Sequence, residues 1–226
     1  MKILHLETSS RNCSVAISDG EHLISLCEEV SENYKQSESL HVFVQWVLEG
    51  AKLTLEDIDA ISLGKGPGSY TGLRIGSSSA KGFCYGLNVP LIATNSLETM
   101  IEPFLNEGYD LIIPLIDARR MEVYAAVFDG TSGNLLVETE AKILDDQSFN
   151  EYPGKKILFV GDGSNKAQDI LQSTDAVFKA DVFPSAKYLI KKAVEKFKQK
   201  EFEDVAYFEP FYLKEFQGVK KKKSEG

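Results

Sequence analysis

The chain has 226 residues, which is enough for one large domain or two small ones with separate cores. Hydrophobic residues make up 43% and charged residues 26%, a composition that excludes a disordered chain and indicates a soluble globular protein. The 34 acidic and 25 basic side chains give a net charge of −9, so attraction to a phosphate backbone is not a property of the whole molecule. Any contact with nucleic acid must be local or shared with a partner.

The cysteine pattern and the hydropathy of the chain indicate a protein of the reducing cytoplasm. Cys13, Cys27 and Cys84 are odd in number and form no CxxC pair, so we expect free thiols rather than a zinc site. Residues 1–10 alternate apolar and polar side chains without a cleavage signal, which predicts a strand and not a signal peptide. No apolar run approaches the roughly 18 residues of a membrane span, so we expect no membrane association.

The N-terminal segment predicts a β-meander and then an unusually apolar helix. Three strands separated by polar turns are expected at residues 2–7, 14–18 and 23–28. Between residues 38 and 53 the polar side chains form a single stripe at steps of three and four, which leaves a helix with a wide apolar surface. Val42 and Trp46 lie on a flank of this helix that we do not expect one core to cover.

A glycine-rich turn follows the next predicted strand, at residues 58–63. It has the sequence GKGPGSYTGLRIG from Gly64 to Gly76, and Ser69 or Thr71 can cap a helix that runs to about Tyr85. Backbone N–H groups exposed beside a helix N-terminus suit an anion or another backbone. From these residues alone a tight strand-to-helix connection is slightly favoured over a ligand site, because the turn matches neither GxxxxGK[ST] nor GxGxxG.

The helix after this turn is rich in small side chains. Gly72, Gly76 and Ala80 recur every four residues, and a glycine in a helix interior costs about 1 kcal/mol relative to alanine. Packing on the sheet explains one stripe of small residues, but this helix and the wide apolar helix before it together suggest a subunit interface. The predicted interface residues are Val42, Trp46, Gly72, Gly76, Ser79, Ala80 and Phe83.

The second half of the chain repeats the opening of three strands. Strands are expected at residues 91–93, 111–116, 122–128, 135–143 and 157–160. Helices are expected after Asn95, near 166–171 and at 186–200. The fold class is therefore α/β, with two lobes that each contain a mixed sheet and flanking helices. We place the N-terminal lobe at 1–106, the C-terminal lobe at 107–216 and a basic tail at 217–226.

Polar turns offer candidate anion or nucleotide contacts. Hydroxyl side chains in the first turn can hold a phosphate, although satisfying a hairpin backbone explains them equally well. The equivalent turn of the second half brings a carboxylate and two guanidiniums, yet exposed arginines in turns are commonly just solvated. A Gly-Asp-Gly turn between a strand and a helix is weaker support. The candidate contacts are Thr8, Ser9, Asp117, Arg119, Gly161 and Gly163.

Catalytic constellations are mostly missing from the sequence. His5, His22 and His41 form no HxxxH or HExxH pair, so we expect neither a metal site nor a resident cofactor. No GxSxG segment provides a serine nucleophile. Phosphoryl transfer on an actin-like fold needs a carboxylate in the first turn to organise Mg²⁺, and Glu7 is the only candidate there.

Several segments closely resemble the bacterial TsaB (YeaZ) family, whose members take part in making N6-threonylcarbamoyladenosine (t6A) in tRNA. The matching segments are ILHLETSSRNCSVAI at 3–17, GPGSYTGLRIG at 66–76, NSLE at 95–98 and IDARRMEVY at 116–124. In the glycine turn the residues of the family signature are Gly66, Pro67, Gly68, Ser69, Tyr70, Thr71, Gly72 and Arg74. Glu7 stands where the family usually has aspartate, and Tyr70 where it usually has phenylalanine.

The resemblance implies an actin-like (ASKHA, ribonuclease H-like) pair of lobes and a noncatalytic partner subunit. Such a subunit pairs with the catalytic TsaD subunit through helices of the N-terminal lobe, acts with the ATPase TsaE, reaches tRNA through the complex and forms a homodimer when alone. An ATP-dependent small-molecule kinase of actin fold is the alternative, supported by the turn-rich hairpins and opposed by the poor chemistry of the first turn. Lys220–Lys223 is interpreted as a solubilising run, with tRNA contact as the other explanation.

Overall fold

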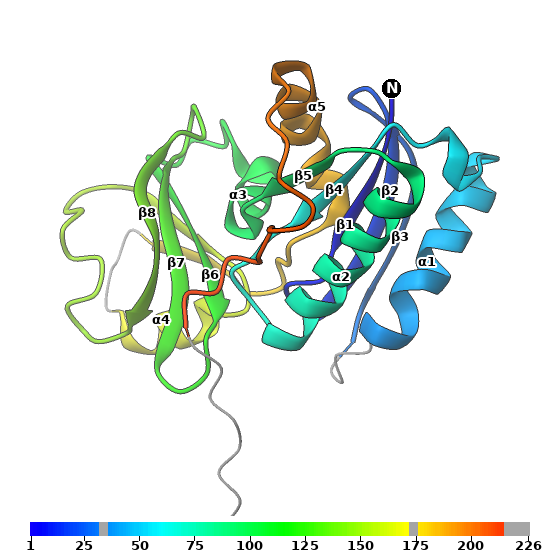
Figure 1. Cartoon of the computed structure of the whole chain (residues 1–226). Coiled ribbons are helices and arrows are strands. Elements are labelled where there is room, and N and C mark those ends of the chain that lie inside the picture. The colour runs from blue at the N-terminus through cyan, green and yellow to red at the C-terminus, as the bar shows by residue number, and fades with distance from the viewer. Residues whose placement is uncertain (32–35, 172–175, 215–226) are drawn as a thin grey trace, which may run out of the picture.

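The computed structural model describes residues 1–31, 36–171 and 176–214, and it contains two five-stranded mixed sheets with helices packed on them (Figure 1). The predicted tail at 217–226 lies outside the described residues. The strands are β1 (Lys2–Glu7), β2 (Asn12–Asp19), β3 (His22–Val30), β4 (Ala60–Gly64), β5 (Leu91–Thr94), β6 (Leu111–Asp117), β7 (Glu122–Asp129), β8 (Leu135–Ile143), β9 (Ile157–Val160) and β10 (Ala176–Lys179). The α-helices are α1 (Gln36–Ala51), α2 (Tyr70–Leu87), α3 (Ser96–Ile101), α4 (Ser164–Ile170) and α5 (Ile190–Gln199). Short 3₁₀ helices are η1 (Leu55–Asp57), η2 (Glu102–Phe104) and η3 (Ala186–Leu189).

The two sheets share one topology. The first has the order β3-β2-β1-β4-β5 and the second the order β10-β9-β6-β7-β8, which is the same plan counted from the other edge. In both, three antiparallel strands open the sheet and two parallel strands complete it. The repeated opening of three strands and the two-lobed α/β fold class are therefore confirmed, whereas the edge strand β10 was not predicted.

Local sequence signals begin two of the helices, α2 and α3, where they were expected. Ser69 caps α2, and its hydroxyl accepts a hydrogen bond from the Gly72 N–H at 3.3 Å. Asn95 caps α3 in the same way, by accepting from the Leu97 N–H at 2.9 Å. Asn88 ends α2 in the left-handed conformation, which asparagine adopts readily. None of the helices in the described part of the chain is long and apolar enough to cross a bilayer.

Each sheet is covered on both faces. Helices α1 and α2 lie side by side on one face of the first sheet, and α5 lies on its other face (Figure 1). Helix α3, which follows β5 in the chain, packs on the second sheet, and α4 covers the opposite face of that sheet. The two lobes therefore exchange helices, since α5 follows the second sheet in sequence but packs on the first. The domain boundary at 106 stays a prediction.

A C-terminal segment, residues 201–214, runs back over the first lobe and reaches the second (orange to red in Figure 1). Phe208 is buried in the core under α1 and α2, and the Phe211 N–H donates to the Lys65 carbonyl at 2.8 Å. At the end of the segment, the Lys214 ammonium forms an ion pair with Glu122 of β7. Residues far apart in the sequence are thus joined by a segment with little regular secondary structure of its own.

Candidate functional site

The glycine-rich turn between β4 and α2 packs directly on the turn between β1 and β2. The Ser69 N–H donates a hydrogen bond to the Ser9 carbonyl at 2.6 Å. A Cβ atom on Gly68 would lie 2.1 Å from that same carbonyl oxygen, so no other residue fits there without a shift of the backbone. The turn therefore holds another backbone, which was one of the two roles that its sequence suggested.

The first half of α2 is equally close to this turn. The Thr8 hydroxyl donates to the Gly72 carbonyl at 2.7 Å, and a Cβ atom on Gly72 would lie 2.0 Å from the Thr8 carbonyl oxygen. A Cβ atom on Gly76 would lie 2.3 Å from Thr8 Oγ1, and Ala80 is fully buried in the core. The close packing that these small residues imply is thus satisfied inside the lobe. The prediction that Gly72, Gly76 and Ala80 belong to a partner surface is therefore corrected, because these three residues are buried inside the lobe.

Glu7 is a completely buried carboxylate at the centre of this packing. One of its oxygens accepts a hydrogen bond from the Ser9 N–H at 2.8 Å and the other accepts from the Ser96 hydroxyl at 2.9 Å. The side chain lies against Gly64, where a Cβ atom would meet Oε2 at 1.9 Å. Burial raises the pKa of Glu7, and the hydrogen bonds oppose that rise. The carboxylate joins β1, β4 and α3, which gives it a structural role.

The other candidate anion contacts of the first turn are also drawn into the fold. Thr8 and Ser9 are both fully buried, and the Asn12 amide donates to the Pro184 carbonyl at 3.0 Å. The hydroxyl of Ser9 finds no hydrogen-bond partner among the described residues. The backbone of this turn thus bonds to other parts of the protein, while the Ser9 hydroxyl stays a candidate for contact with a bound anion or nucleotide.

In the second lobe, the Gly161–Gly163 turn between β9 and α4 also packs closely on another backbone segment. The Gly163 N–H donates to the Leu115 carbonyl at 3.0 Å, and a Cβ atom on Gly161 would lie 2.3 Å from that oxygen. Asp117 Oδ1 accepts from the Arg119 N–H and from the Lys166 ammonium, each at 2.6 Å. The glycines again allow close backbone packing, and their role in anion binding stays a prediction.

The Gly161–Gly163 turn also holds a half-buried carboxylate. Asp162 Oδ1 accepts a hydrogen bond from the Asp117 N–H at 2.9 Å. Burial raises the pKa of Asp162, whereas the charges of Arg11 and Lys166 act in the opposite direction. Arg11 belongs to the β1–β2 turn, so the polar turns of the two lobes lie within electrostatic reach of each other.

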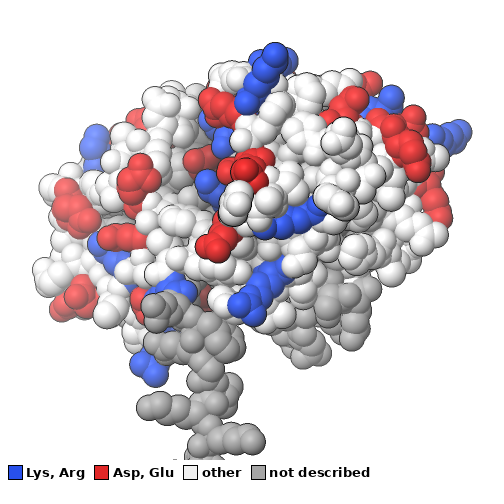
Figure 2. Space-filling view, in the orientation of Figure 1, with Lys and Arg blue, Asp and Glu red and all other residues white. Residues whose placement is uncertain are grey.

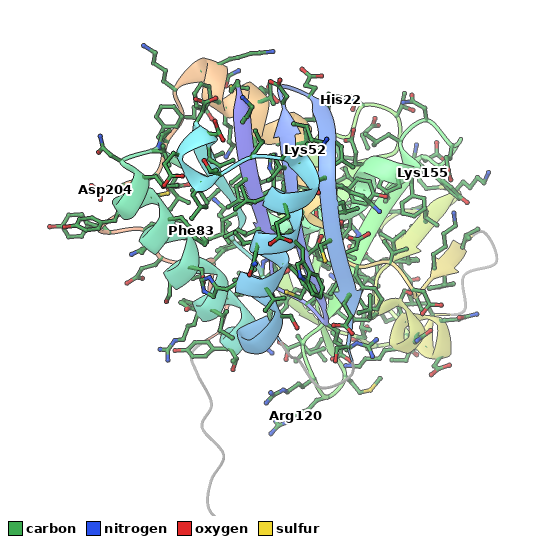
Figure 3. The ribbon with its side chains drawn as sticks, turned by 90° about the vertical axis from the view of Figure 1, so that its right-hand side faces the viewer. His22, Lys52, Phe83, Arg120, Lys155 and Asp204 are labelled. Carbon is green, nitrogen blue, oxygen red and sulfur yellow. The ribbon has the colours of Figure 1, made fainter. Side chains whose placement is uncertain are left out.

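The exposed faces of α1 and α2 form a continuous surface, which we call the α1–α2 surface. The two helices are joined where Ser79 Oγ lies 3.1 Å from His41 Nε2 and where the His41 and Phe83 rings lie 5.7 Å apart. Figure 3 labels Phe83 on α2. Val42 is 40% and Trp46 54% exposed, as expected for a flank that the core does not cover. Ser79 and Phe83 are half-buried between the helices.

Three further residues of this surface were missed. Tyr85 is 88% exposed, and a Cβ atom on Gly82 or on Gly86 would meet nothing within 4 Å. Together with Ser78 these glycines form a second stripe of small residues with a step of four. The sequence contained this stripe, but it gave no means of telling which of the two stripes faces outward.

The signature residues at the start of α2 contact the C-terminal segment. The Arg74 guanidinium lies over the Tyr70 ring at 4.3 Å and donates to its hydroxyl at 2.5 Å. The Tyr212 ring lies 4.9 Å from the Tyr70 ring.

In the described part of the chain, no group of three or more His, Cys, Asp or Glu side chains is placed to hold a metal ion.

Comparison with known proteins identifies relatives over most of the chain. The family model described as "TsaD: tRNA N6-adenosine threonylcarbamoyltransferase" matches residues 28–218. The tRNA threonylcarbamoyladenosine biosynthesis protein TsaB of Escherichia coli K12 is 29% identical over 225 residues, which are 95% of each chain. The TsaB protein of Buchnera aphidicola from Acyrthosiphon pisum is 30% identical over 88% of this chain and 90% of its own.

Solved structures agree with these relatives. A YeaZ-like protein of Pseudomonas aeruginosa has a TM-score of 0.80 at 25% identity, over 94% of this chain and 99% of its own. The ADPNP-bound activator of 2-hydroxyisocaproyl-CoA dehydratase from Clostridium difficile, at 12% identity and a TM-score of 0.50, has a similar fold and covers 90% of this chain. The chain therefore belongs to the family that the TsaD model describes, and within it to the TsaB (YeaZ) proteins.

Proposed function

We propose that this chain is a noncatalytic partner subunit in the biosynthesis of t6A in tRNA. It docks through the α1–α2 surface on a TsaD-type catalytic subunit and works with a TsaE-type ATPase. The tRNA is reached through the assembled complex, in the cytoplasm, and the chain forms a homodimer when no partner is present. Relatives named as TsaB biosynthesis proteins over most of the chain support the pathway.

One observation carries the docking proposal, which is the composition of the α1–α2 surface. Large side chains are exposed at Trp46 and Tyr85, and Gly82 and Gly86 on the same helix face leave room for another backbone to approach. Exposed glycines weaken a helix by about 1 kcal/mol each, so their presence fits a surface that is covered in the assembly. Tryptophan and tyrosine side chains are typical anchors at the centre of an interface.

The noncatalytic role is supported by the carboxylates at the two turns, which bond to other groups of the protein itself. The Glu7 carboxylate, which a kinase would need for Mg²⁺, accepts two hydrogen bonds from the protein and is completely buried. Asp117 is paired with Lys166 at 2.6 Å. No described feature favours the kinase alternative over the partner subunit.

The proposal is tested by mixing the chain with a TsaD subunit of the same organism and measuring the mass of the complex by light scattering. We expect a heterodimer whose affinity falls at least about tenfold in Trp46→Glu and in Tyr85→Glu, because an aromatic anchor is replaced by a charge. The control is Leu136→Glu on β8, a position that is 55% exposed on the other lobe. Absence of association with a folded TsaD, or an equal loss in the control, would contradict the proposal.

A further inference from the structure

Helix α2 lies between α1 and the C-terminal segment (Figure 1). On one side of the helix, Ser79 and Phe83 lie against His41 of α1. On the other side, the Lys81 ammonium donates a hydrogen bond to the Ala206 carbonyl at 3.1 Å. The C-terminal segment is therefore a direct neighbour of the α1–α2 surface, on the side opposite to α1.

A tight turn in this segment, at residues 204–208, exposes one aromatic ring and buries the next. Asp204 Oδ1 accepts hydrogen bonds from the Ala206 N–H at 2.8 Å and the Tyr207 N–H at 3.1 Å. The Phe208 N–H donates to the Asp204 carbonyl at 2.8 Å. Phe208 is buried in the first core, whereas Tyr207 is 85% exposed. Figure 3 shows Asp204 at the edge of the molecule, next to the helix that carries Phe83.

The exposed aromatic surface continues from α2 onto this turn. Tyr85 follows Lys81 by four residues, so both lie on the same face of the helix, and Tyr85 is 88% exposed. Tyr207 follows Ala206, whose carbonyl Lys81 holds. The 18 residues of α2 include no Asp or Glu, and Figure 2 shows a largely uncharged surface over this helix. Depletion of charge around exposed aromatic rings is typical of the centre of an interface.

We propose that the 204–208 turn extends the α1–α2 surface and that Tyr207 contacts the same TsaD-type subunit as Tyr85. This inference rests on the proposed function, which assigns the α1–α2 surface to that subunit. A stable interface covers about 800 Å² on each partner, whereas a helix with its side chains is only about 10 Å wide. A subunit that covers α2 therefore also covers the segments on its two sides, which are α1 and the 204–208 turn.

The backbone of the turn prepares Tyr207 for this contact. A tyrosine side chain has few rotatable bonds, so binding orders it at a low entropic cost when its backbone is already held. Asp204 holds that backbone through the two hydrogen bonds that its side chain accepts. Asp204 is thus a positioning residue, which acts on the partner through the Tyr207 ring.

The test titrates the full chain with a TsaD subunit of the same organism by isothermal titration calorimetry. Tyr207→Ala removes the exposed ring and keeps the Phe208 anchor, so we expect the wild-type midpoint of thermal unfolding and a Kd raised about fivefold or more. The matched control is Leu136→Ala, which truncates a side chain that is 55% exposed on β8 of the other lobe. Its Kd should equal that of the wild type.

Two variants of Asp204 test the positioning role. Asp204→Ala removes the acceptor of both hydrogen bonds and should raise the Kd about twofold to fivefold, because binding must then order the turn. Asp204→Asn keeps an oxygen at the same position and should restore most of the affinity. Equal Kd values for Asp204→Ala and the wild type would show that the turn does not position the ring.

The outcomes separate this inference from the proposed function. A wild-type Kd for Tyr207→Ala, beside a raised Kd for Tyr85→Glu, would overturn the extension and leave the docking proposal standing. An equal loss in Leu136→Ala would also overturn the extension. If Tyr207→Ala weakens only the homodimer, measured by sedimentation equilibrium, the turn contacts a second copy of this chain and the inference is wrong. Absence of a complex with the wild-type chain would contradict the proposed function and the extension together.

Discussion

The Ser96 hydroxyl donates a hydrogen bond to the Glu7 carboxylate at 2.9 Å, and both side chains are completely buried. The Gly66 N–H in turn donates to Ser96 Oγ at 3.2 Å, and the Ser96 N–H donates to the Gly66 carbonyl at 2.9 Å. This network links the last residue of β1, the glycine-rich turn and the first residue of α3. A buried carboxylate with few partners is costly unless each oxygen is satisfied, so the three segments are fixed relative to one another.

Glu7 should make stability depend on pH. Burial raises the pKa of Glu7 above its ordinary value of 4.5, and this effect exceeds the opposing effect of the hydrogen bonds from Ser9 and Ser96. The folded protein therefore binds the proton more tightly than the unfolded chain does. The stability contributed by Glu7 is fully present below pH 4.5 and is lost as the pH rises through the raised pKa of the folded protein. Urea unfolding from about pH 5 to about pH 8 should therefore show Glu7→Gln gaining stability relative to wild type as the pH rises.

Ser96→Ala provides the control for this titration, because it keeps the carboxylate and removes one hydrogen bond that stabilises the charged form. Its stability should fall more steeply with pH than that of the wild type. Parallel pH profiles for all three proteins would show that Glu7 does not titrate differently in the folded state.

Glycines at two positions of α2 should respond to alanine in opposite directions. Gly72→Ala places a Cβ atom 2.0 Å from the Thr8 carbonyl oxygen and should destabilise the protein by about 2 to 3 kcal/mol. Gly82→Ala enters open space on the same helix and should stabilise it by about 0.5 to 1 kcal/mol. Chemical denaturation of the two variants gives both values. Equal effects at the two positions would mean that the contact between α2 and the first turn is looser than described.

Ala80→Arg should unfold the first lobe rather than only block a partner. Ala80 has no exposed surface and belongs to the core shared with α1, so a long charged side chain has neither room nor a counter-ion. We expect a loss of at least about 3 kcal/mol, seen as a lower midpoint in thermal unfolding by circular dichroism. Ser78→Arg, on the exposed side of the helix, is the matched variant and should keep the wild-type midpoint. A stable, folded Ala80→Arg protein would place this residue at the surface.

Two adjacent residues of the C-terminal segment should differ strongly. Phe208 is buried against the first core, and its replacement by alanine should cost about 3 to 5 kcal/mol. Tyr207 is 85% exposed, and Tyr207→Ala should change the free energy of unfolding by less than about 0.5 kcal/mol. Urea unfolding of the pair separates the anchoring of this segment from a general effect of aromatic loss. If Phe208→Ala is as stable as Tyr207→Ala, the segment is not part of the core.

Most strands and helices could be predicted from the sequence, because their signals are local. Ser69 and Asn95 were expected to cap helices and do so. The repeated opening of three strands predicted two lobes, and the resemblance to TsaB proteins at the glycine-rich turn agrees with the family match. The short strand β10 was missed, because four residues at a sheet edge carry no clear alternation.

The candidate site was predicted only in part, and the reason is the pattern of α2. The sequence determined that this helix has small residues at steps of four, but two such stripes occur, one through Gly76 and one through Gly82. Only the tertiary structure decided that the first packs on Thr8 and that the second faces outward. Likewise, the ion pair of Lys214 with Glu122 joins residues 92 positions apart, which no local pattern can specify. Helix periodicity depends on neighbours in the chain, whereas burial depends on distant segments that meet only when the chain folds.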